Sequence, residues 1–131
     1  MKAQPRRRPV VLAMLAAALF AVAACGPGER RVALTAVPGG DSGRGAAAMG
    51  LYGCAACHTI PGVAGATASV GPPLTDFAYR QYIAGQLTNT PENLVRWIMD
   101  PQGVEPGTAM PNMGVTESDA RDIAAYLATL K

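Results

Sequence analysis

The chain has 131 residues, of which half are hydrophobic and 15% are charged. This length and composition predict one small globular domain and an additional apolar segment. Its formal charge is +2, but four of the eleven basic residues lie before residue 25 and all nine acidic residues lie after it. The later part therefore carries seven basic and nine acidic residues, and this absence of a basic patch argues against nucleic-acid binding.

Residues 1–24 have the pattern of an export signal, with a basic start followed by an apolar run from Val10 to Ala24. The run is shorter than the roughly 20 residues that a membrane span needs. It ends in Ala23-Ala24-Cys25-Gly26, which resembles the lipobox of bacterial lipoproteins. We therefore predict lipidation of Cys25 and a location on the periplasmic side of a bacterial membrane. An ordinary cleaved signal and an uncleaved anchor are the alternatives.

Residues 25–40 are rich in Gly and Pro and show no sustained hydrophobic period. This composition predicts a flexible tether between the lipidated Cys25 and a domain that covers residues 41–131. In the alternative interpretation, Val32, Leu34 and Val37 pack onto that domain. The sequence does not separate the two.

The first predicted helix runs from about Ser42 to Tyr52. Its glycines weaken it by intrinsic propensity, but Gly45 and Gly50 would allow a second helix to approach closely. A short helical turn is expected within residues 79–84, and no stretch predicts a strand.

The next helix begins with Thr90 as N-cap and Pro91 at the first helical position, and it ends at Asp100-Pro101. The last one opens with the capping-box pattern Thr116-Glu117-Ser118-Asp119. Its apolar stripe consists of Ile123, Tyr126, Leu127 and Leu130. Three main helices and no strand predict an all-α fold.

The segment Cys54-Ala55-Ala56-Cys57-His58 has the spacing of a c-type haem attachment site. Two thiols at this spacing can form thioethers with the two vinyl groups of one porphyrin, and the adjacent His58 can bind the iron. Zinc would need four ligands, which are hard to find in a chain with one histidine and one further cysteine. A thioredoxin-like pair lacks the βαβ pattern it requires, and an ordinary pair of core cysteines remains as an alternative.

A second axial ligand must come from another residue type. Met110 and Met113 lie in a predicted loop, whereas Met49 and Met99 occupy apolar helical positions typical of a core. Met110 precedes a proline, which favours an extended backbone, and it is the expected ligand. Met113 and an open iron site are the alternatives. A His/Met iron favours electron transfer, whereas an open site would permit peroxide or gas chemistry.

The domain resembles a class I c-type cytochrome over nearly all of its length. Four segments carry this resemblance: the haem motif, Gly71-Pro72-Pro73-Leu74, the loop Gly107–Pro111 and Ala125-Tyr126-Leu127. It implies a cytochrome c fold, with three main helices and loops around one haem c that is attached through Cys54 and Cys57.

The resemblance also implies roles for residues around the haem. The Pro72 carbonyl would accept a hydrogen bond from the His58 ring. Arg80 would neutralise a haem propionate, or else be a solvated surface charge. Trp97 would face the haem, or else only pack in the core. The first helix would cross the last, with Gly45 and Met49 meeting Tyr126.

More narrowly, the segments 57–62, 82–85 and 89–94 resemble small membrane-linked cytochromes that accompany haem-copper terminal oxidases. This resemblance implies a one-electron carrier, not itself an enzyme, between a quinol-oxidising complex and a terminal oxidase. A permanently bound subunit of an oxidase or dehydrogenase is the first alternative. A haem enzyme or gas-binding protein is the second.

Overall fold

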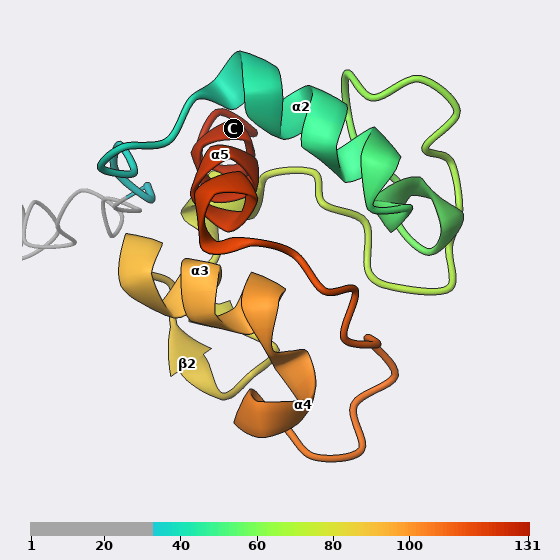
Figure 1. Ribbon diagram of the computed structural model, residues 1–131, viewed down its shortest axis with the longest axis vertical. Helices are drawn as coiled ribbons and strands as arrows, with labels where there is room; N and C mark the ends of the chain where they lie inside the picture. Colours follow the sequence, from blue (N-terminus) through green and yellow to red (C-terminus); the bar gives the residue numbers. More distant parts are fainter. Residues whose placement is uncertain (1–32) are drawn as a thin grey trace, which may run out of the picture. The chain divides into compact units, whose positions relative to one another are not determined.

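The computed structural model describes residues 33–131, and the predictions for residues 1–24, for Cys25 and for Val32 lie outside the described residues (Figure 1). The helices are α2 (Ser42–Leu51), α3 (Pro91–Met99), α4 (Pro101–Val104) and α5 (Glu117–Leu127). Two short 3₁₀ helices span Cys54–Ala56 and Phe77–Tyr79, and β1 (Tyr82–Ile83) pairs antiparallel with β2 (Leu87–Thr88). Helices dominate, so the predicted all-α class is confirmed. No helix in the described part is long and apolar enough to cross a membrane.

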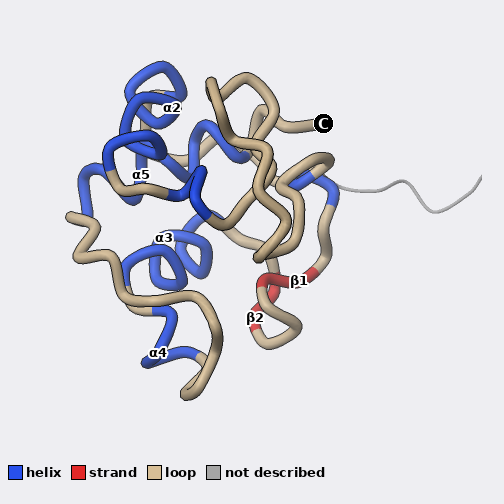
Figure 2. Tube along the Cα trace, turned by 90° about the vertical axis from the view of Figure 1, so that its right-hand side faces the viewer, coloured by secondary structure: helices blue, strands red, loops and turns tan. Residues whose placement is uncertain are grey.

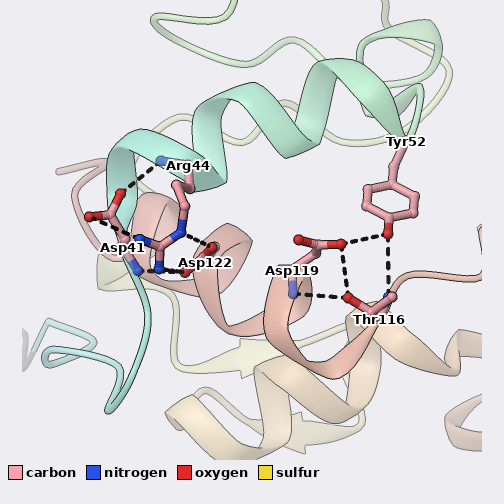
Figure 3. Close-up of polar contacts among 6 residues, drawn as sticks. All are labelled: Asp41, Arg44, Tyr52, Thr116, Asp119 and Asp122. Carbon is pink, nitrogen blue, oxygen red and sulfur yellow. Dashed lines mark hydrogen bonds and ion pairs between the residues drawn. The ribbon is translucent and has the colours of Figure 1, made fainter.

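Helices α3 and α5 begin where their capping residues predict. The Thr90 hydroxyl accepts a hydrogen bond from the Asn93 amide at 3.3 Å, and Pro91 occupies the first turn of α3. Thr116 caps α5 by accepting from the Asp119 amide at 3.2 Å. The carboxylate of Asp119 completes only half of a capping box, because it accepts from the Thr116 and Tyr52 hydroxyls instead of the Thr116 amide (Figure 3).

Helix α2 crosses α5 at very short range (Figure 1). A Cβ atom at Gly45 would overlap the carbonyl oxygen of Asp122, so only glycine allows the two backbones to approach this closely. The predicted role of Gly45 is confirmed, whereas Gly50 has no atom within contact distance and does not share it. The nearest neighbours of Gly45 are Asp122 and Ile123. The Tyr126 hydroxyl donates to the carbonyl of Pro61 at 2.5 Å, and the expected contact of Gly45 and Met49 with the Tyr126 side chain stays a prediction.

The prediction of a helical turn within residues 79–84 is wrong. The turn lies at Phe77–Tyr79, and the following residues form the β1–β2 hairpin (Figure 2). Ala84 and Gly85 both have positive φ, and the Gln86 amide donates to the Ile83 carbonyl at 2.9 Å. Positive φ at both central residues is the turn geometry that joins antiparallel strands. This local turn favours a hairpin over a helix.

Helix α4 has no counterpart in the prediction. Asp100 ends α3, but its carboxylate also accepts from the Gly103 amide at 2.9 Å, and Pro101 sits at the first position of the new helix. The same Asp-Pro pair thus stops one helix and starts the next, because proline at a first helical position costs no hydrogen bond.

The hydrophobic core lies between α2, α3 and α5 and extends to the segment before α2. Leu34 and Val37 are 7% and 5% exposed, and the Leu34 amide donates to the Ala78 carbonyl at 2.6 Å. For these two residues the structure supports packing onto the domain in place of a flexible tether. The packed part therefore begins before residue 41, because burial of two apolar side chains there is favourable.

Candidate functional site

One cavity of about 330 Å³ brings together residues from most of the described chain. Its wall includes the end of α2, the cysteine motif, the 70–74 loop, α3, the methionine loop and α5. All seven residues predicted to contact a cofactor line it: Cys54, Cys57, His58, Pro72, Arg80, Trp97 and Met110. These positions span 57 residues of sequence, so the fold is what assembles them.

The His58 ring is oriented by the loop that follows it. Its Nδ1 lies 2.7 Å from the carbonyl oxygen of Pro72. Because a carbonyl only accepts, Nδ1 is the donor in this contact, and in the neutral imidazole Nε2 then keeps its lone pair. Gly71 lies against the ring, where a Cβ atom would come within 2.5 Å of Cε1. The Gly71 amide also donates to the Cys57 carbonyl at 2.7 Å, which ties this loop to the motif. The arrangement leaves Nε2 available to a metal.

The two cysteines are held on a single turn of backbone. Gly53, with a φ of 72°, leads into the 3₁₀ helix Cys54–Ala56, and the Cys54 carbonyl accepts from the amides of Cys57 and His58. Both thiols are partly buried and neither forms a disulfide with another described residue. Burial raises the pKa of the Cys54 thiol, which keeps it protonated near neutral pH. A pair of thiols beside a cavity is the arrangement that two thioether bonds require.

Met110 and Met113 both line the cavity. Met110 is half-buried, whereas Met113 is 42% exposed, and its Cε methyl group lies close to Gly53. Both sulfurs are on the same loop, so the preference for Met110 as an axial ligand stays a prediction.

Arg80 is half-buried beside the cavity. Its guanidinium donates to the Pro73 carbonyl and lies 5.0 Å from the centre of the Phe77 ring. Partial burial lowers the pKa of Arg80, and Asp76 opposes this effect in part. None of the ion pairs in the described part includes Arg80. The site therefore holds a partly desolvated cation that a buried or half-buried anion could pair with.

The rest of the wall is largely apolar, and the sequence predicted core positions, not site positions, for three of its residues: Met49, Ile123 and Leu127. Trp97 both lines the cavity and packs against the core, so its two expected roles coincide. The buried apolar residues of the wall are Met49, Leu74, Phe77, Ile83, Leu94, Ile98, Val115, Ile123 and Leu127. Helical periodicity predicted that several of these side chains are buried. Only the fold shows that they line a cavity. A large apolar group that carries an anionic substituent fits this lining and Arg80.

A small helical protein with a cysteine–histidine turn facing an apolar cavity has the architecture of a c-type cytochrome. Residues 42–131 match the family model for cytochrome c, and the chain belongs to the cytochrome c family. Members of this family bind haem c covalently and transfer electrons, so this chain is an electron-transfer haem protein.

Two curated relatives match part of the chain. It is 42% identical over 79 residues to cytochrome c oxidase subunit 2 of Alkalihalophilus pseudofirmus, a match that covers 60% of this chain and 22% of the relative. It is 35% identical over 82 residues to cytochrome c oxidase subunit 2 of Bacillus sp. (strain PS3), covering 60% and 23%. The chain spans less than a quarter of the length of these relatives.

Proposed function

We propose that this chain is a one-electron carrier with a single haem c, bonded through Cys54 and Cys57 and ligated by His58 and Met110. The observation that carries the proposal is the cavity itself, since all four residues line it and His58 Nδ1 lies 2.7 Å from the Pro72 carbonyl. When bound, the haem supplies an iron that is reversibly oxidised and reduced. The protein would hold both axial positions and keep water and other ligands from the iron.

Several residues have distinct tasks in this proposal. The hydrogen bond from His58 Nδ1 to Pro72 fixes the plane of the ring and increases the electron donation of Nε2. Arg80 would neutralise a propionate, because its guanidinium is partly desolvated and has no carboxylate partner within the described residues. Trp97 and the buried apolar residues would exclude water from the ring, which raises the reduction potential.

Paired methionine variants test the iron ligands. Met110→Ala should lower the midpoint potential, remove the far-red absorption of a thioether–ferric iron bond, and allow carbon monoxide to bind the ferrous protein. Met113→Ala is the matched control and should change none of these. The reverse result would assign the ligand to Met113. Rapid carbon monoxide binding by the unmodified protein would favour the haem enzyme or gas-binding alternative.

We further propose that a terminal oxidase accepts the electron and that a quinol-oxidising complex supplies it. The two relatives named oxidase subunits support an oxidase partner. A permanently bound subunit of an oxidase or dehydrogenase is the second candidate, supported by the same relatives. Co-purification with a larger complex after detergent extraction would favour the subunit, whereas isolation as a free protein would favour the carrier. Lipidation of Cys25, which would hold the carrier at the periplasmic face, is tested by the mass of the mature N-terminal peptide.

The surface around the cavity suggests how a partner docks. Three exposed hydrophobic residues line the cavity mouth: Val70, Tyr82 and Met113. Of the acidic and basic side chains in the described part, only Glu105 and Arg80 line it, and they carry opposite charges. Docking should therefore rest on apolar contact with weak electrostatic steering.

Electron-transfer rates to a purified terminal oxidase test this surface. We expect the second-order rate constant to change by less than about threefold between low and high salt, because little net charge faces the partner. Tyr82→Ser should lower the rate constant, and Glu92→Gln, at a residue that does not line the cavity, should not. A steep salt dependence would contradict apolar docking.

A further inference from the structure

The side chain of Gln102 is bonded to the methionine loop at three points. Its Nε2 donates to the carbonyls of Thr108 at 2.8 Å and Met110 at 2.9 Å. Its Oε1 accepts from the amide of Gly107 at 3.1 Å. Gln102 therefore uses both donors and its acceptor on the backbone of one four-residue stretch.

This stretch has little other support. After α4 the chain forms a long loop that returns to α5 (Figure 1). Within the described residues, positions 109–113 take part in no backbone–backbone hydrogen bond, and Thr108 makes one, to Glu105 at 3.1 Å. A loop without ladder or helix bonds has many accessible conformations. The hydrogen bonds from Gln102 select one of them.

The support for Gln102 is itself rigid. It sits on α4, whose first residue, Pro101, is buried and whose N-terminus is capped by Asp100. A Cβ atom at Gly103 would overlap the Asp100 carboxylate, so the capping carboxylate packs directly against the backbone of α4. A half-buried amide on a fixed short helix is well placed to orient a neighbouring loop.

We propose that Gln102 is a positioning residue that presets the loop so that the Met110 sulfur faces the iron. The inference rests on the proposed function, because it requires Met110 to be the axial ligand. Gln102 does not line the cavity. It acts by reducing the freedom of the loop, so that less of that freedom is lost when the sulfur binds.

Three variants separate the parts of this proposal. Gln102→Leu removes all three hydrogen bonds at similar volume. Gln102→Glu keeps the acceptor for the Gly107 amide and loses the donors to Thr108 and Met110. Gln86→Leu is the matched control, because Gln86 is exposed in the β1–β2 hairpin and its side chain makes no hydrogen bond within the described part.

We expect Gln102→Leu to weaken the far-red thioether band of the ferric protein and to raise its cyanide affinity by about tenfold or more. Gln102→Glu should be intermediate near neutral pH, and acidification to pH 4 should restore part of the band as the protonated carboxyl regains one donor. Amide hydrogen exchange at Gly107 should accelerate in the leucine variant and not in the glutamate variant. Gln86→Leu should leave every one of these measurements unchanged.

The outcomes distinguish the inference from the function on which it rests. If Met110→Ala removes the band and Gln102→Leu leaves the band and cyanide affinity unaltered, the inference is wrong and the ligand assignment stands. If Met110→Ala itself has no effect, the proposed ligand is wrong and the inference fails with it. Should Gln102→Leu not fold, unchanged spectra and cyanide affinity in Gln102→Glu near neutral pH would contradict the proposal equally.

Discussion

The Arg44 side chain of α2 and the Asp122 carboxylate of α5 are joined by two hydrogen bonds, from Nε at 2.7 Å and from a terminal nitrogen at 2.9 Å (Figure 3). The Asp41 amide adds a third donor to the same carboxylate at 2.7 Å. Asp122 is only 2% exposed, although it is charged. Its burial is tolerated because three donors replace the water it loses. The pair therefore fastens one end of α2 to α5.

The stability of the protein should depend on the ionisation of Asp122. The hydrogen bonds from Arg44 and the Asp41 amide hold the pKa of Asp122 below its ordinary value. A lowered pKa in the folded state stabilises the fold above the unfolded pKa of about 4, and this stabilisation is lost as pH falls through the folded value. Urea unfolding of the wild type and Asp122→Asn from pH 7 to pH 2 should show a difference that shrinks below about pH 4.

Glu117→Gln is the matched control for this experiment. Glu117 lies on the same helix and pairs with Arg121 at 2.6 Å, but both side chains are exposed. Exposed pairs contribute little, so its effect on unfolding should be small at every pH. An equal effect of the two substitutions would contradict a special role for Asp122.

Gly45→Ala should destabilise the fold by about 1–3 kcal/mol, because the added methyl group would overlap the backbone of α5. Gly50→Ala lies on the same helix with open space around it and should stabilise by about 0.5–1 kcal/mol through helix propensity alone. Thermal or urea unfolding measures both. If both substitutions stabilised the protein, α2 and α5 would have to move apart without loss of unfolding free energy, which would contradict the close packing at Gly45.

Gly71→Ala should disturb the His58 ring rather than the fold as a whole. The new methyl group would come within 2.5 Å of Cε1 and 2.8 Å of Nδ1, so the ring must turn or move from Pro72. We expect a changed ferric spectrum and a higher midpoint potential, since the ring would lose the hydrogen bond that increases its electron donation to the iron. Ser69→Ala, at an exposed residue outside the cavity lining, is the control and should leave the spectrum unaltered.

Leu34→Ala should destabilise the protein by about 2–4 kcal/mol if the segment before α2 belongs to the folded domain. Leu51→Ala, at an 87% exposed leucine, should change the unfolding free energy by less than about 0.5 kcal/mol. Equal, small effects in urea unfolding would contradict the packing of Leu34. The comparison thus measures where the stable domain begins.

Local chemistry explains what the sequence predicted well. Two helix starts are marked by local residues: Thr90 with the proline that follows it, and Thr116. Their capping contacts lie within four residues, so the sequence alone locates them. The spacing of Cys54, Cys57 and His58 is likewise local. All seven predicted site residues face one cavity, although the sequence alone offered no measure of their separation in space.

Features that depend on distant partners were not predictable in the same way. The burial of Leu34 requires Ala78, 44 positions later, and the hairpin depends on positive φ at Ala84, a residue with no preference for it. Gln102 is an ordinary polar helix residue until the loop returns to it. The role of Gln102 becomes visible only once α4 is known to exist. From the sequence, Asp100-Pro101 predicts the end of α3 and does not reveal that a second helix starts there.

The Arg44–Asp122 contact spans 78 residues of chain, and this separation has a consequence for the order of maturation. During synthesis, the segment with both thiols emerges well before α5, its eventual neighbour across the cavity. Contacts between residues so far apart in sequence form slowly, because a long loop must close first. The polypeptide therefore passes through an interval in which α5 has not yet enclosed the thiols of Cys54 and Cys57.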